Sequence, residues 1–102
     1  MVHIEPIPLK NGVAIGVRLE FPKTNVLAIS TKNGYLMCGV LDVRGLDEKL
    51  AERKIVAARV TGVKTFEDML KATVQQATEE AKKIGIVEGE TTGKEALEKM
   101  SE

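Results

Sequence analysis

Four side chains between positions 38 and 59 have the chemistry of a functional site: Cys38, Asp42, Arg53 and Arg59. Cys38, the only cysteine, would be a nucleophile if its thiolate lay at the end of a strand, near a helix N-terminus and an arginine. The alternative is a small buried apolar residue, which a free cysteine usually is. No histidine lies near Cys38 in the sequence to act as its base, so the sequence favours the buried residue.

Asp42 follows the apolar run that ends at Leu41, and it has two interpretations. As the N-cap of a helix it would contribute about 1 kcal/mol to stability. As a carboxylate at the C-terminal edge of a sheet, it would lie where ligand sites often form. The sequence favours the cap.

The two arginines complete the candidate site. Arg59 interrupts an otherwise apolar run, so its guanidinium must meet a partner, water or a ligand anion. An ion pair of Arg53 or Arg59 with Asp42 would be structural, and we favour this pair over an anion site. If the four candidates share a pocket, the ligand expected there is a small anionic metabolite.

Composition argues against several classes of function. The 15 basic and 15 acidic residues cancel and are not blocked together, which argues against nucleic acid and against a polybasic membrane anchor. One cysteine and one histidine cannot build a Cys/His metal site or an internal disulfide. No apolar run reaches the ~18 residues that span a bilayer, and the start lacks a signal-peptide pattern. We therefore expect a cytoplasmic protein without a metal or cofactor.

The stretch from Asn33 to Asp42 organises the predicted fold. Asn33-Gly34 is typical of a two-residue type I′ turn, which needs positive φ at both positions. It predicts a hairpin of strands 26–31 and 35–40, with Ile29 opposite Cys38. The run 35–41 lacks polar alternation, which is typical of a central strand covered on both sides. The more apolar face of this hairpin carries Leu27, Ile29, Leu36, Cys38 and Val40.

Two further strands precede this hairpin, at residues 2–9 and 13–21. The second has the cleanest period-two pattern, and Ala14, Gly16, Arg18 and Glu20 face away from its apolar set. That apolar set consists of Val13, Ile15, Val17, Leu19 and Phe21.

Two prolines limit how these strands pair. A two-residue loop at Asn11-Gly12 would place Pro6 and Pro8 at hydrogen-bonded positions, where proline has no N–H to donate. We therefore expect a longer loop or a shifted register. The prolines also predict that the first strand lies at the edge of the sheet.

The segment after the central hairpin predicts a helix and a last strand. Val43, Leu46 and Leu50 recur at helical spacing up to Arg53. The helix begins at Asp42 or later, near Leu46, because Gly45 weakens its first turn. The strand follows at residues 55–61.

Three cap signatures then predict helices that start at Thr65, Thr73 and Thr92, and the second helix alternatively starts at Thr78. Gly85 predicts a left-handed helix stop. The order of elements predicts an α+β fold as a single domain over residues 1–102. Its sheet is mainly antiparallel with about five strands, and its helices pack mostly on one face.

Several segments, in order along the chain, resemble the YunC-like family of small bacterial and archaeal proteins. They are Pro22-Lys23-Thr24-Asn25, Gly34-Tyr35-Leu36-Met37-Cys38-Gly39, Leu41-Asp42, Arg53, Ala58-Arg59, Gly62-Val63-Lys64-Thr65 with Leu70, and Gly93-Lys94-Glu95-Ala96-Leu97. The match covers nearly the whole chain, and the Tyr-Leu-Met-Cys-Gly block with its Asp is the most specific part. The resemblance implies a single α/β-type domain of unknown function and no established reaction. His3 lies outside the pattern and receives no role.

Two functions remain as hypotheses. The first is a homo-oligomeric binding or interaction module that assembles through an exposed strand edge or through apolar helix faces. The second is an enzyme or sensor of a small anionic metabolite, with a site near Cys38, Asp42, Arg53 and Arg59. Because the sequence offers no convergent acid–base set, we favour the first.

Overall fold

The computed structural model describes residues 1–39 and 53–102. In order, its elements are β1 (Val2–Leu9), β2 (Gly12–Phe21), β3 (Thr24–Ser30), β4 (Tyr35–Met37), β5 (Ala57–Arg59), α2 (Phe66–Lys71), β6 (Gln76–Ala77), α3 (Glu79–Lys83) and α4 (Gly93–Met100). The strands form one sheet in sequence order, antiparallel throughout except for the parallel pair β4–β5. The predicted α+β class is confirmed, with six strands in the described residues. The helix predicted from Asp42 lies outside them.

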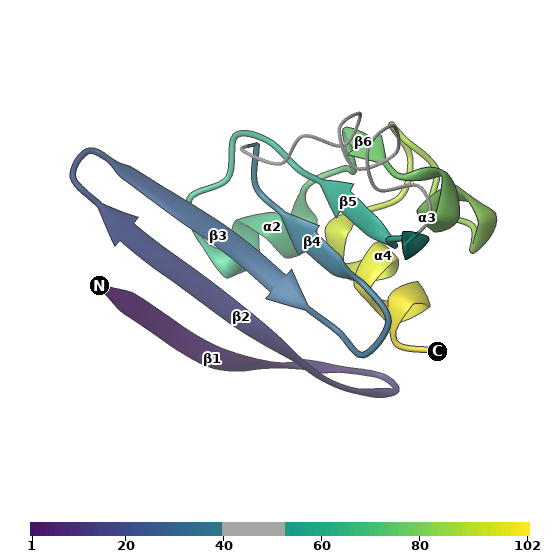
Figure 1. Cartoon of the computed structure of the whole chain (residues 1–102), viewed down its shortest axis with the longest axis horizontal. Helices are drawn as coiled ribbons and strands as arrows, with labels where there is room; N and C mark the ends of the chain where they lie inside the picture. Colours follow the sequence, from purple (N-terminus) through teal and green to yellow (C-terminus); the bar gives the residue numbers. More distant parts are fainter. Residues whose placement is uncertain (40–52) are drawn as a thin grey trace.

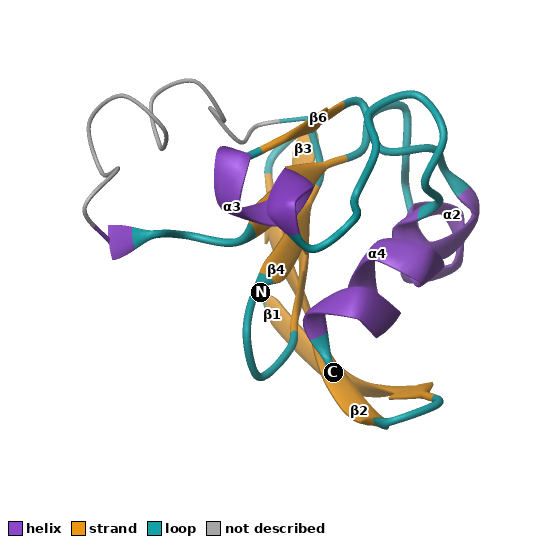
Figure 2. Cartoon of the chain, turned by 90° about the vertical axis from the view of Figure 1, so that its right-hand side faces the viewer, coloured by secondary structure: helices purple, strands orange, loops and turns teal. Residues whose placement is uncertain are grey.

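The helices α2 and α4 pack together behind the sheet, as Figure 1 and Figure 2 show. A glycine permits this contact, since a Cβ at Gly93 would lie 1.9 Å from the backbone oxygen of Met69. The side chains of Ala96, Leu97 and Met100 point from α4 into the core. The helix α3 lies apart from this pair, beside β5 and β6.

The predicted helix starts are largely confirmed. Thr65 and Thr92 are N-caps, and Thr92 forms a full capping box with Glu95. The third cap is Thr78, so the alternative start of the second helix is the correct one. Thr73 instead forms an isolated bridge with Thr92.

The hairpin of β3 and β4 differs from the prediction at its turn. Thr31 N–H donates to the Gly34 oxygen at 2.8 Å, so the loop is centred on Lys32-Asn33. Ile29 therefore faces Leu36 and not Cys38. Neither residue of the predicted turn, Asn33 or Gly34, has positive φ.

Position 34 needs a glycine because of close packing and not because of its backbone φ. The change of register does not alter which side chains share a face of the sheet. A Cβ at Gly34 would lie 2.5 Å from the backbone oxygen of Val56. The register differs by two residues, so every described side chain of the hairpin keeps its predicted face. Leu27, Ile29, Leu36 and Cys38 are accordingly buried on one side of the sheet.

The pairing of β1 with β2 confirms the shifted register. Leu9 pairs with Gly12 around a Lys10-Asn11 loop, which puts Pro8 opposite Val13 and Pro6 opposite Ile15. β1 is an edge strand, as its prolines predicted.

The apolar stripe of β2 faces away from the helices, contrary to the usual assignment of such a stripe to the core. Val13 and Ile15 are 63% and 44% exposed, whereas Ala14 and Gly16 are buried. The reason is the approach of α2: a Cβ at Gly16 would lie 3.0 Å from ring atoms of Phe66. Small residues on β2 thus leave the space that Phe66 occupies.

Candidate functional site

Cys38 lies in the core of the protein. It continues the β3–β4 ladder opposite Leu27, whose oxygen accepts the Cys38 N–H at 3.1 Å. The Leu27 N–H in turn donates to the Cys38 sulfur at 3.4 Å, and Cys38 is only 7% exposed. This is the environment of a structural cysteine, because reactive thiols lie in accessible, electropositive surroundings.

The other predicted site residues are not gathered around that sulfur. Arg59 pairs with Met37 across β4 and β5, so it lies on the opposite face of the sheet from Cys38 and is half-buried. Arg53 is exposed in the segment before β5. Asp42 lies outside the described residues, so its role as a cap or as the partner of either arginine stays a prediction.

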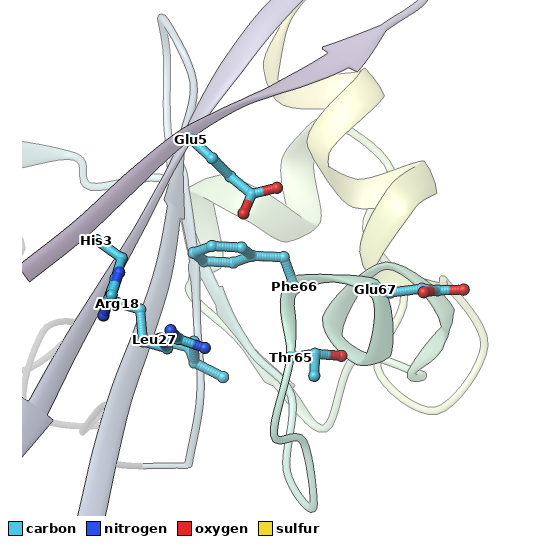
Figure 3. Close-up of a pocket in the computed structure, with 7 residues that line it drawn as sticks. All are labelled: His3, Glu5, Arg18, Leu27, Thr65, Phe66 and Glu67. Carbon is cyan, nitrogen blue, oxygen red and sulfur yellow. The ribbon is translucent and has the colours of Figure 1, made fainter.

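A hollow of about 330 Å³ lies elsewhere, between β1, β2, β3 and α2, on the helix-covered side of the sheet. Its lining, drawn in Figure 3, consists of His3, Glu5, Arg18, Leu27, Thr65, Phe66 and Glu67. Sequence reasoning assigned none of these residues to a site. The signal was present in the polar positions of strands 2–9 and 13–21, but only the observed register brings them together.

His3 and Arg18 line the hollow and belong to a polar cluster on β1 and β2. His3 pairs directly with Arg18 across the two strands. The carboxylate of Glu20 is in contact with His3 Nε2 and accepts a hydrogen bond from Arg18 Nη2 at 3.2 Å. The chain start lies close by, since the Met1 ammonium donates to the Glu20 backbone oxygen at 3.1 Å. This cluster holds the guanidinium of Arg18 at the margin of the hollow.

The apolar wall of the hollow comes from Phe66 and Leu27. Phe66 is the first residue of α2, and its N-cap Thr65 accepts the Asp68 N–H at 3.0 Å. The carboxylate of Asp68 accepts the Lys64 N–H at 3.0 Å, and this bond is the main cause that lowers the pKa of Asp68. The cap therefore fixes where the Phe66 ring meets the sheet.

Two carboxylates border the hollow, and they differ in their partners. Glu67 forms an ion pair with Lys71 at 3.0 Å, one turn along α2. Glu5 is exposed and forms no ion pair within the part of the chain that the structure describes. Glu5 is thus the carboxylate available to a ligand.

A second feature is an apolar surface on the other side of the sheet. We call this surface the open face. It consists of ten residues of β1, β2 and β3 that point away from the helices: Val2, Ile4, Pro6, Pro8, Val13, Ile15, Val17, Leu19, Ala28 and Ser30. None of the ten is charged. Ile4 and Val2 are 67% and 58% exposed.

Two further observations bear on function. Across residues 1–39 and 53–102, no three His, Cys, Asp or Glu side chains are grouped as a metal site requires. No helix in those ranges has both the length and the apolar character needed to cross a membrane.

Comparisons with known proteins identify the family. Residues 37–100 match the family model described as a domain of unknown function, DUF1805. The chain is 44% identical over 100 residues to the uncharacterized protein YunC of Bacillus subtilis strain 168, over 98% of both proteins. It is also similar to the crystal structure of TA1206, a protein of unknown function from Thermoplasma acidophilum, with a TM-score of 0.87 and 33% identity over 99% of this chain and 94% of that one. The chain therefore belongs to the YunC-like, DUF1805 family, as its sequence segments indicated.

Proposed function

We propose that this protein is a homo-oligomeric interaction module and that the open face is the contact between two copies. The observation that carries the proposal is the uncharged outward surface of β1 and β2, where Ile4, Val13 and Val2 are each more than half exposed. Contiguous apolar patches of this kind mark interaction sites in other proteins.

The other surfaces named by the sequence are less suitable for assembly. The edge strand β1 contains Pro6 and Pro8, which cannot donate to a strand of a second copy. The apolar side of α4 is already used, since Ala96, Leu97 and Met100 are each 0% exposed. We therefore propose that two copies meet through the sheet face and not through a strand edge or a helix face.

A second copy is the occupant that best suits the open face. The ten residues of the open face carry no charge, so two copies can meet over them without burying an unpaired ion there. Arg59 lies on the same side of the sheet but on β5, outside the open face. The eight residues of β1 span about 27 Å, and three strands about 4.8 Å apart give a flat area of roughly 400 Å². A standard interface buries about 800 Å² per partner, so we expect a reversible dimer that dissociates on dilution.

Sedimentation velocity over a range of concentrations tests this proposal. The native chain is expected to form a dimer that dissociates on dilution, and Ile4→Lys is expected to be monomeric at every concentration. The matched control is Val87→Lys, which places the same charge on an exposed valine outside the sheet, 46% exposed in the segment after α3. A native chain that is monomeric throughout, or a dimer that Ile4→Lys leaves intact, overturns the proposal.

A further inference from the structure

We propose that the hollow between β1, β2 and α2 binds a small zwitterion that carries its ammonium and carboxylate groups at opposite ends of an apolar chain, as an ω-amino acid does. In this arrangement Arg18 takes the carboxylate of the ligand, Glu5 takes its ammonium group, and its apolar part lies against Phe66. This inference goes beyond assembly of the chain, because the hollow and the open face lie on opposite sides of the sheet.

Arg18 supplies the anion-binding half. A guanidinium carries five N–H donors, and in the described residues only Nη2 has a protein acceptor, the Glu20 carboxylate at 3.2 Å. The Nε atom is inaccessible to solvent and has no hydrogen-bond acceptor among the described residues, so packing holds the guanidinium in place. About a third of the side chain stays exposed, at 34%. The remaining Nη donors can therefore bind a carboxylate with charge-assisted hydrogen bonds.

Glu5 supplies the cation-binding half. It lies two residues from His3 on β1 and opposite Gly16, on the same side of the sheet as Arg18. Figure 3 shows the Glu5 carboxylate and the Arg18 side chain on either side of the Phe66 ring. A ligand that joins the two charges must therefore pass along that ring, which favours a molecule with an apolar part.

Charge and size exclude the simpler ligands. A plain carboxylate would meet Arg18 but would also face the like charge of Glu5, which has no ion-pair partner among the described residues. A plain amine would meet Arg18 as a like charge. Only a ligand with both charges satisfies both sides. The volume of about 330 Å³ is at the lower end of the range for ligand pockets, so it suits an amino acid better than a nucleotide.

NMR titration of the ¹⁵N-labelled full chain at pH 7 tests the proposal. The zwitterionic probes are 5-aminopentanoate and 6-aminohexanoate, and the analogues that each lack one charge of 6-aminohexanoate are hexanoate and pentylamine. A zwitterion is expected to shift the amide resonances of His3 and Phe66 and to bind at least tenfold more tightly than either analogue. The proposal fails if neither amino acid shifts these resonances, or if one of the analogues binds as tightly as 6-aminohexanoate.

Variants locate the binding and separate it from assembly. Glu5→Gln and Arg18→Gln are each expected to weaken binding about tenfold, which corresponds to about 1.4 kcal/mol. Glu90→Gln changes another exposed carboxylate, outside the hollow, and is expected to leave binding unchanged. Binding that survives both Glu5→Gln and Arg18→Gln places the ligand elsewhere and overturns the proposal. Ile4→Lys, which is expected to abolish the dimer, is expected to keep the binding, so the two proposals fail independently.

Discussion

The ring of Phe66 occupies the space that Gly16 leaves open on β2. A Cβ at position 16 would lie 3.0 Å from both Cε1 and Cζ of Phe66, and 2.9 Å from Cδ1 of Ile7. The 2.9 Å distance is shorter than Cβ contacts in proteins are, and the 3.0 Å distances are tighter than nine in ten of them. The contact fixes α2 against the sheet, and it also sets one wall of the hollow.

Gly16→Ala is therefore expected to destabilise the protein by about 1–3 kcal/mol, the usual cost of overpacking a core. Urea unfolding followed by circular dichroism measures the change. Gly39→Ala is the matched control, since within the described residues its Cβ would meet only Thr61 Cγ2, at an ordinary 3.5 Å. Adding Phe66→Leu to Gly16→Ala should recover part of the loss. Equal stabilities for Gly16→Ala and the native chain would show that this space is not needed.

The turn between β3 and β4 gives a second prediction. It tests whether position 34 needs a glycine because the Val56 backbone lies close by or because the backbone φ is positive. A Cβ there would lie 2.5 Å from the backbone oxygen of Val56, which cannot rotate away. Gly34→Ala is expected to cost about 1–3 kcal/mol. Asn33→Ala removes only an exposed hydrogen bond to the Glu102 oxygen and should stay within about 0.5 kcal/mol. A larger loss at Asn33 than at Gly34 in the same unfolding experiment would favour the turn that the sequence suggested.

This hairpin also shows what the sequence can predict. The predicted register placed Leu27, Ile29, Leu36 and Cys38 together on the more apolar face of the hairpin. Because side chains alternate with a period of two, a register error of two residues left that face intact, and all four are buried. The exact register could not be predicted, because it depends on the closeness of Gly34 to Val56, which is far away in sequence.

The buried side of β2 could not be predicted from its own pattern. Alternation gives the period of a strand but not the side that the helices cover. The structure turns Ala14 and Gly16 toward α2 and leaves Val13 outside. The hollow escaped prediction for the same reason, since it exists only where α2 meets the strands that carry His3 and Arg18.

Burial of Cys38 makes a third prediction. The sulfur is in the core and accepts a backbone N–H, so a reagent reaches it only when the structure opens locally. Labelling of the native protein by iodoacetamide is expected to be at least about 100-fold slower than labelling in concentrated guanidinium. Mass spectrometry at timed intervals measures both rates. Native labelling as fast as in the unfolded chain would restore Cys38 as a candidate nucleophile.

The capping box of α4 makes a prediction about pH. Glu95 Oε1 accepts the Thr92 N–H at 3.1 Å and the Thr92 hydroxyl at 3.0 Å. The first of these bonds is the main cause that lowers the pKa of Glu95 below its ordinary value of 4.5. A carboxylate with a lowered pKa in the folded state stabilises the protein above its unfolded pKa, and this stabilisation is lost as pH falls through the folded pKa.

Glu95→Gln is therefore expected to be less stable than the native chain at pH 7, with a difference that shrinks below about pH 4.5 and vanishes in stronger acid. Thr92→Ala removes the other half of the box and is expected to cost about 0.5–2 kcal/mol at neutral pH. Urea unfolding of both variants at several pH values measures these changes. The control is Glu90→Gln, whose side chain caps no described helix and whose stability should follow that of the native chain. Because the cap also places Gly93 against α2, a pH-independent deficit in Glu95→Gln would mean that the side chain acts through packing and not through its charge.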